Sequence, residues 1–148
     1  MKASNDIRNL RESVRLLERK LGMLDEINAP CCGVTFAQCH AIVEIGRAET
    51  IYLNKLADIL GLEKSTMSRT INNLVNIGTV LRDIDPEDRR FITIKLTEKG
   101  INLFQEIEKG REEYFSKVYN SVPELKREQV IESLQILIKA LVENSCCK

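Results

Sequence analysis

Cysteine and histidine side chains are concentrated in one short stretch of the chain. The 148 residues contain five cysteines and a single histidine. Three of the thiols and the imidazole lie within ten residues, at Cys31, Cys32, Cys39 and His40. Thiolates bind soft metal and metalloid ions, and a thiol of lowered pKa reacts with oxidants. The stretch is a candidate effector site, either for thiol modification or for a soft ion held by Cys31, Cys32 and Cys39.

A purely structural interpretation of these residues stays open beside the chemical one. Cysteine often serves as a small buried apolar residue, and Cys39 belongs to an apolar helical pattern. Consecutive helical residues point roughly 100° apart, so Cys39 and His40 do not readily bind one ion together. Cys146 and Cys147 stand at the C-terminal end, where we expect them to be exposed and passive, or to contribute to the site of a partner chain.

A second candidate set could form hydrogen bonds with nucleic acid. A helix is predicted from Lys64 to Ile77, closed by Gly78, and one arc of it is apolar and expected to face the core: Met67, Ile71, Leu74 and Val75. The opposite arc is short and polar, with Ser65, Arg69, Asn72 and Asn76, and with Ser68 and Asn73 at its edges. Hydroxyl and amide groups can approach bases and phosphates, and arginine pairs with guanine. Alone, this helix equally fits an ordinary solvated face.

A β-hairpin is predicted directly after that helix. Val80–Arg82 and Arg90–Leu96 have the pattern of strands, and the acidic, proline-containing segment 85–88 is typical of a turn. Its tip places Arg89 and Arg90 beside Asp88. One arginine could enter a DNA minor groove while Asp88 pairs with the other and sets its direction. The alternative is a charged loop that only keeps the protein in solution.

The flanking segments predict helices that need partners. The first carries apolar residues at steps of three and four: Ile7, Leu10, Val14, Leu17, Leu21 and Leu24. This narrow seam indicates a helix that packs on another helix, and we expect it to end at Asn28-Ala29-Pro30, with Cys31-Cys32-Gly33 as a connector. The last helix, opened near Pro123, is apolar over a wide arc from Val130 to Val142.

The elements between these segments complete a winged helix-turn-helix order. Thr35 and Gln38 form a capping box for a helix that runs to about Ile45-Gly46. A short helix fits Leu53–Leu60, closed by Gly61, and another helix begins at Thr97-Glu98-Lys99. The order of three helices and a two-stranded hairpin is the winged helix-turn-helix plan.

Composition narrows the function. The formal net charge is zero, with 22 basic and 22 acidic residues, which argues against coating of DNA by charge alone. We expect a cytoplasmic protein, because no apolar run could span a bilayer and the N-terminal stretch does not follow the signal-peptide pattern. Neighbouring Cys39 and His40 do not form a nucleophile and base pair, and no glycine-rich phosphate loop is present, so we expect no enzyme. A winged-helix module that binds only proteins is the other alternative.

Five motifs resemble, in order and spacing, the MarR family of bacterial transcription regulators, and the flanking helices extend the resemblance over nearly the whole chain. The motifs are Leu56–Leu62 (LADILGL), Ser65–Arg69 (STMSR), Leu74–Gly78 (LVNIG), Asp85–Arg90 (DPEDRR) and Leu96–Gly100 (LTEKG).

The resemblance implies a mainly α fold with a small β-hairpin wing, a winged helix-turn-helix joined to a helical dimerisation region (α+β). Residues 1–148 would form one domain, with 35–100 as the DNA-binding region and with 4–27 and 101–144 as the dimerisation region. The recognition helix would enter the major groove and the wing the minor groove of double-stranded DNA. The expected DNA-binding residues are Lys64, Ser65, Thr66, Ser68, Arg69, Asn72, Asp88, Arg89 and Arg90.

The resemblance also implies regulation. We expect a homodimeric repressor released from a pseudo-palindromic operator by a small ligand, a metal ion or thiol modification, without a certain cofactor. The zinc-sensing branch of the family has ligands at the start of the helix that carries Cys39 and His40. The segment Ile101–Tyr119 holds no histidine to complete such a zinc site, whereas a three-thiol site for a softer metal or metalloid ion at Cys31, Cys32 and Cys39 stays open.

Overall fold

The computed structural model describes the backbone of residues 2–144 and the side chains of that range except residues 23–32. The chain divides between residues 108 and 109 into two compact units, which are considered separately. Cys146 and Cys147 lie outside the described residues, as do the side chains of Cys31 and Cys32. The predictions made for these four thiols therefore stay predictions.

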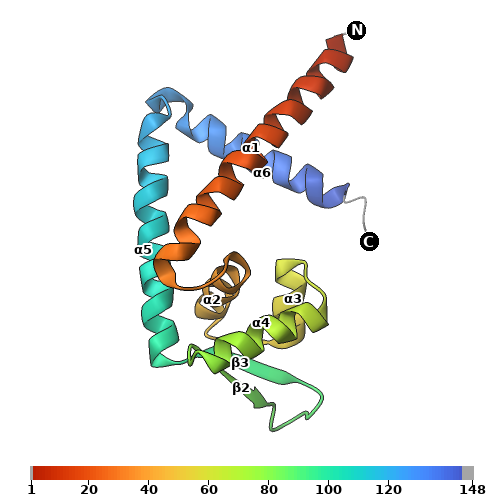
Figure 1. Cartoon of the computed structure of the whole chain (residues 1–148). Helices are drawn as coiled ribbons and strands as arrows, with labels where there is room; N and C mark the ends of the chain where they lie inside the picture. Colours follow the sequence, from red (N-terminus) through yellow and green to blue (C-terminus); the bar gives the residue numbers. More distant parts are fainter. Residues whose placement is uncertain (1, 145–148) are drawn as a thin grey trace. The chain divides into compact units, whose positions relative to one another are not determined.

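The middle of the chain folds as a winged helix (Figure 1). Its elements are α2 (Phe36–Ala48), β1 (Thr50–Tyr52), α3 (Leu53–Leu60), α4 (Lys64–Asn76), β2 (Val80–Ile84) and β3 (Ile92–Leu96). We call residues 34–108 the head. The mainly α fold with a β wing, predicted from the sequence, is confirmed.

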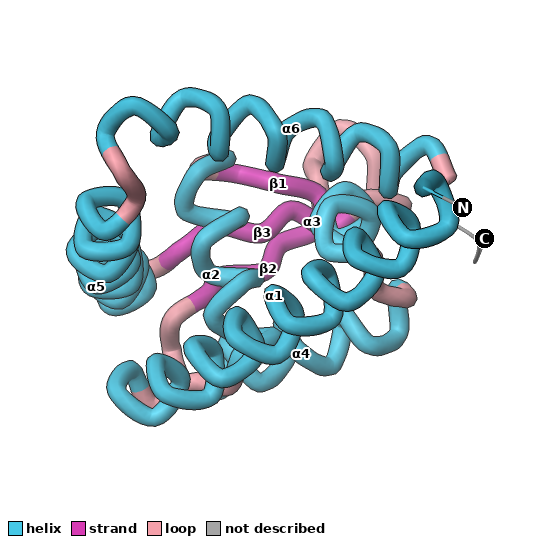
Figure 2. The backbone as a smooth tube through the Cα atoms, turned by 90° about the horizontal axis from the view of Figure 1, so that it is seen from above, coloured by secondary structure: helices cyan, strands magenta, loops and turns pink. Residues whose placement is uncertain are grey.

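The sheet has one strand more than the predicted hairpin. All three strands are antiparallel, in the order β1-β3-β2, and Figure 2 shows them side by side. The added strand, β1, is only three residues long, too short for an alternating pattern to be recognised in the sequence. Its central Ile51 is buried and lies opposite the fully buried Ile94 of β3. Packing of these two side chains ties β1 to the wing.

The head has a single aliphatic core. Ile42 and Ile45 of α2, Leu56 of α3 and Ile71 of α4 are fully buried. The other buried apolar residues are Val34, Ala41, Val43, Ile51, Leu53, Ala57, Met67, Leu74, Val80, Ile94 and Ile107. Among the described side chains, every buried apolar one thus belongs to the head, which holds its elements in place by burial within one chain.

Local signals set the start of α2 and both ends of α3 as predicted, whereas α2 runs on to Ala48, past its expected end near Ile45-Gly46. The Thr35 hydroxyl accepts the Gln38 N–H at 3.3 Å, and the Gln38 side chain accepts the Thr35 N–H at 3.0 Å, which completes the capping box of α2. Helix α3 has the predicted bounds, and Gly61 closes it with a φ of 63°. That left-handed conformation is one that glycine adopts without steric cost.

The first helix, α1, is longer than predicted. It runs over Lys2–Cys32, so the expected end at Asn28-Ala29-Pro30 is wrong, and Cys31-Cys32 belong to the helix instead of a connector. The proline ring fixes φ at about −65°, which is a helical value, so Pro30 lacks a backbone hydrogen-bond donor but can keep helical backbone angles. The helix ends where Gly33 takes a φ of 68°.

The remaining elements are α5 (Glu98–Ser121), a short 3-10 helix η1 (Glu124–Lys126) and α6 (Arg127–Glu143). Many apolar side chains of the long helices stay exposed. They include Ile7, Leu10, Leu17 and Leu21 of α1, Phe115, Val118 and Tyr119 of α5, and Val130, Ile131, Leu134, Ile138, Leu141 and Val142 of α6. Over the described residues, no helix has the length and apolar character needed to cross a membrane.

Candidate nucleic-acid interface

Helix α4 buries one face and exposes the other. Met67, Ile71 and Leu74 are fully buried, as predicted, but Val75 is 38% exposed, so its assignment to the core is wrong. Val75 lies at the edge of the apolar arc, and Thr70 fills the opposite edge at 9% exposure. The Thr70 hydroxyl donates to the carbonyl oxygen of Thr66 at 3.1 Å, which satisfies this polar group inside the core.

The opposite face of α4 carries the predicted polar residues in solvent. Ser65, Thr66, Arg69 and Asn72 are exposed and Ser68 is half-buried. Lys64 is the exposed first residue of the helix, and no side chain caps the N-terminus. Uncapped N–H groups at the start of a helix are a ready site for an anion such as a phosphate. The face thus combines short hydrogen-bonding groups, one arginine and a positive helix end.

One residue of this face is linked to the hairpin. A guanidinium nitrogen of Arg82, on β2, donates to the side-chain oxygen of Asn72 on α4. The sequence analysis did not include Arg82 in the site, because nothing local shows that a strand residue and a helix residue ten positions apart meet. The only signal in the sequence was that Arg82 is a basic residue in the strand that follows α4.

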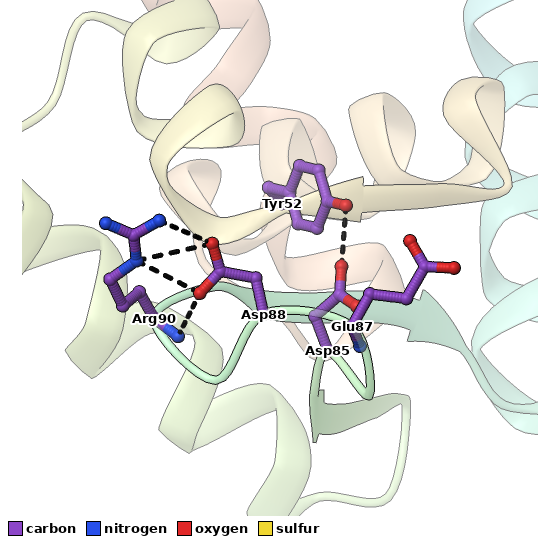
Figure 3. Close-up of polar contacts among 5 residues, drawn as sticks. All are labelled: Tyr52, Asp85, Glu87, Asp88 and Arg90. Atoms are coloured by element: carbon purple, nitrogen blue, oxygen red, sulfur yellow. Dashed lines mark hydrogen bonds and ion pairs between the residues drawn. The ribbon is translucent and has the colours of Figure 1, made fainter.

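At the tip of the wing, Asp88 holds Arg90 through a forked contact. The Arg90 Nε donates to Asp88 Oδ1 at 3.0 Å and its Nη2 donates to Oδ2 at 2.7 Å, while the Arg90 backbone N–H also donates to Oδ1 (Figure 3). These donors lower the pKa of Asp88 and, reciprocally, the carboxylate raises the pKa of Arg90. The Arg90 side chain remains 84% exposed, so it is oriented by the protein yet open to a ligand.

The neighbouring Arg89 differs from Arg90. It is exposed, and among the described residues no hydrogen bond or ion pair holds its side chain. The structure therefore pairs Asp88 with Arg90 and leaves the Arg89 side chain exposed to solvent.

A second carboxylate anchors the base of the wing tip. The Tyr52 hydroxyl donates to Asp85 Oδ2 at 2.6 Å and the Glu87 N–H donates to Oδ1 at 2.9 Å (Figure 3). The Tyr52 hydrogen bond lowers the pKa of Asp85, and the carboxylate raises the pKa of Tyr52. The Tyr52 ring also lies 5.1 Å, centroid to centroid, from Phe91. These contacts tie the wing to β1, and the sequence analysis missed them because Tyr52 is distant in the chain.

The candidate thiol site is only partly visible. Cys39 is half-buried on α2 and packs against the head core, and the His40 ring meets the Phe36 ring edge-on at 4.2 Å. Within the described side chains, which exclude Cys31 and Cys32, no three acidic, cysteine or histidine residues are arranged to hold a metal ion. The predicted role of these residues is therefore not tested by the geometry.

Known proteins share this fold and this sequence pattern. Residues 34–92 match the model of the MarR family. The HTH-type transcriptional regulator BilQ of Clostridium symbiosum is 24% identical over 116 residues, which are 78% of this chain and 81% of that protein. A MarR transcriptional regulator from Methanosarcina mazei superimposes with a TM-score of 0.78 at 26% identity, over 90% of this chain and 96% of the other.

Several of the similar structures contain DNA. FabT of Streptococcus pneumoniae, solved in complex with DNA, has a TM-score of 0.82 at 18% identity, over 90% of this chain and 98% of that one. Fold and sequence pattern together define a DNA-binding transcription regulator of the winged-helix class, and not an enzyme. Residues 34–92 match the MarR family model, and the chain as a whole is similar in sequence and fold to MarR-family regulators.

Proposed function

We propose that this protein is a homodimeric repressor that binds a pseudo-palindromic operator and is released from it by an effector. The observation that carries the proposal is the arrangement at the wing, where Asp88 holds Arg90 with its side chain exposed. An arginine already oriented by a carboxylate loses little side-chain freedom on binding. Such a residue is suited to the narrow, electronegative minor groove.

The polar face of α4 would read the major groove. Arg69 is the residue suited to a guanine edge, and Ser65, Thr66 and Ser68 are short enough for bases or phosphates. Lys64 and the uncapped N-terminus of α4 would bind the backbone, as would Arg89. Phosphate contacts position the helix and base contacts give specificity, so the two groups should respond differently to substitution.

Dimerisation would cover the exposed apolar residues of the long helices. Leu10 and Leu17 of α1 and Leu134 and Leu141 of α6 are each more than two-fifths exposed. A two-fold dimer covers the same patches on both chains, and it would present two heads about one DNA turn apart. In this scheme residues 1–148 act as one MarR domain, with 35–100 as the DNA-binding region and 4–27 and 101–144 as the dimerisation region.

An effector would act by preferring one spacing of the two heads. A ligand that binds both states equally shifts nothing, so it must bind better to the form that does not fit DNA. We propose two routes in the cytoplasm: an organic ligand, or modification or soft-ion binding at Cys31, Cys32, Cys39 and His40. The half-buried Cys39 beside the head core supports the second route, because a change there would reach α2 directly.

The test is fluorescence anisotropy on a duplex that the wild-type protein selects from a random library. Arg69→Ala and Arg90→Ala should each weaken binding by roughly 5- to 100-fold, and Arg69→Ala should also relax the base preference at one position in each half-site. Lys139→Ala removes the same charge from the exposed surface of α6 and should leave binding unchanged.

The outcomes separate the alternatives. Binding that survives both arginine substitutions would refute the assigned residues, and a wild-type protein that selects no DNA would favour a protein-interaction module. Zinc, arsenite and peroxide are then added to the complex of reduced protein. If a reagent releases the DNA, and substitution of Cys31, Cys32 or Cys39 abolishes that release, the thiol route is supported. If none of the three reagents changes binding, the cysteines have only a packing role.

A further inference from the structure

The contact between Arg82 and Asn72 fixes which way the Asn72 amide points. Arginine carries only N–H donors, so its partner on Asn72 must be the amide oxygen and not the amide nitrogen. The NH2 group of Asn72 therefore occupies the other side of the amide. Because Asn72 is exposed on the polar face of α4, that NH2 group is available to a ligand of this face.

This orientation changes what an asparagine can recognise. A free asparagine reads adenine with two bonds, accepting from the adenine N6 amino group and donating to N7. Asn72 already uses its oxygen for Arg82. The second lone pair of that oxygen lies next to a guanidinium, whose positive charge opposes the approach of another N–H donor. What remains is a donor, which needs an acceptor on the base.

We propose that Arg82 is a specificity-determining positioning residue, which makes Asn72 prefer guanine, whose edge offers the two acceptors N7 and O6, over adenine, whose single acceptor N7 lies beside an amino donor. This inference rests on the proposed function, since it assigns the base read by one residue of the α4 face. Arg82 acts through Asn72 and needs no base contact of its own. Its place on β2 also makes the preference depend on how the hairpin sits against α4.

The experiment measures base preference and not affinity alone. Full-length wild type, Arg82→Ala, Asn72→Ala and the double variant are titrated on duplexes in which each position of the library-selected site carries each of the four base pairs. The position whose preference disappears in Asn72→Ala is the one that Asn72 reads. There the wild type should favour guanine over adenine, and Arg82→Ala should shift the preference toward adenine by about 5-fold or more.

Three further comparisons isolate the role of Arg82. In the Asn72→Ala background, Arg82→Ala should leave the preference at this position unchanged, because its effect passes through Asn72. Lys95→Ala removes one charge from an exposed residue of the same hairpin and should change no base preference. Arg82→Lys, which keeps a charged donor, should retain part of the wild-type preference. Circular dichroism of each variant checks that the fold is intact.

Each outcome decides the inference. A wild-type preference for adenine, cytosine or thymine at the Asn72 position overturns it. So does an Arg82→Ala variant that weakens binding equally for all four base pairs, because that is the behaviour of a phosphate contact. If Arg69 and Arg90 behave as proposed while Arg82 does not, only this inference fails. If the wild type selects no site, the proposed function fails and the inference fails with it.

Discussion

The head and the long helices have the same kind of amphipathic sequence pattern, but only in the head are the apolar faces buried within one chain. In the head, Ile42, Leu56 and Ile71 are fully buried within one chain. In α1 and α6, Leu10 and Leu141, which belong to equally regular apolar patterns, are 53% and 55% exposed. A periodic pattern therefore indicates that a face will be buried, but not whether the partner lies in the same chain.

The physical reason is the length and arrangement of the elements. Helices α2, α3 and α4 have 13, 8 and 13 residues, and with the sheet they share one core, in which each helix buries apolar side chains completely. Helix α1 has 31 residues, with a narrow seam along its described part, and a seam of that kind is typical of pairing with another long helix. The three predictions below test this contrast, from the largest expected effect to the smallest.

The largest effect is expected from a charge placed in the seam of α1. Leu10→Glu removes apolar contact from both copies of a dimer and places two carboxylates against apolar neighbours. Loss of two leucine contacts alone corresponds to roughly 3–6 kcal/mol of association free energy. Analytical ultracentrifugation should show a monomer where the wild type is a dimer, while circular dichroism still reports a folded head.

The matched control is Asn5→Glu. It adds the same charge to the same helix, on the arc opposite the seam. This variant should sediment as the wild type does. Equal dissociation by both substitutions would mean that charge on α1, and not the apolar seam, governs association, and the contrast between the two regions would be lost.

Features set by neighbouring residues could be predicted from the sequence. The Thr35 and Gln38 capping box and the closure of α3 at Gly61 depend on residues within one turn, and both formed as expected. The order of helices and strands followed from the change of period between α4 and the hairpin. The family motifs also predicted the fold of the head correctly, because they contain the same local helix-ending and turn residues.

Features set by distant residues could not be predicted. The short β1 forms because Ile51 packs opposite Ile94, 43 positions later in the chain. Thr70 is buried on the core face of α4, where Val75 was predicted to be, because its hydroxyl donates a hydrogen bond to the Thr66 carbonyl oxygen. The pairs Arg82 with Asn72 and Tyr52 with Asp85 are contacts between elements, for which one sequence gives no spacing rule.

Helix α5 allows the two regions to be compared within one element. A methyl group at Gly100, in the head, would meet the backbone carbonyl of Thr79, whereas a methyl group at Gly110 would meet nothing within 4 Å. Gly100→Ala should cost about 1–3 kcal/mol, since overpacking moves the backbone. Gly110→Ala should stabilise by about 0.5–1 kcal/mol, because alanine favours a helix interior.

Urea denaturation of the two variants at one protein concentration measures both changes, and their opposite signs are the test. A loss of stability at Gly110 comparable to that at Gly100 would show that the surface of α5 around Gly110 is closely covered in the protein in solution.

The smallest effect concerns the anchor of the wing, which is the one place where the head buries a carboxylate. Asp85 is 9% exposed and accepts the Tyr52 hydroxyl, which lowers its pKa, while the pKa of Tyr52 is raised. The stability that the lowered pKa of Asp85 contributes is present above the unfolded pKa of about 4, and it is lost as the pH falls through the folded pKa. The stability that the raised pKa of Tyr52 contributes is present below the unfolded pKa of about 10, and it is lost as the pH rises through the folded pKa.

Tyr52→Phe removes the hydroxyl and keeps the ring beside Phe91, which lies 5.1 Å away in the wild type. The variant should therefore be less stable than the wild type between about pH 5 and pH 9, and the difference should narrow at both extremes. Urea denaturation from pH 3 to pH 11 follows the difference, and carbon-detected NMR should show the pKa of Asp85 moving up toward its ordinary value. A difference that does not vary with pH would mean that Tyr52 holds the wing only through ring packing, so that the head, like the long helices, depends at this point on apolar contact alone.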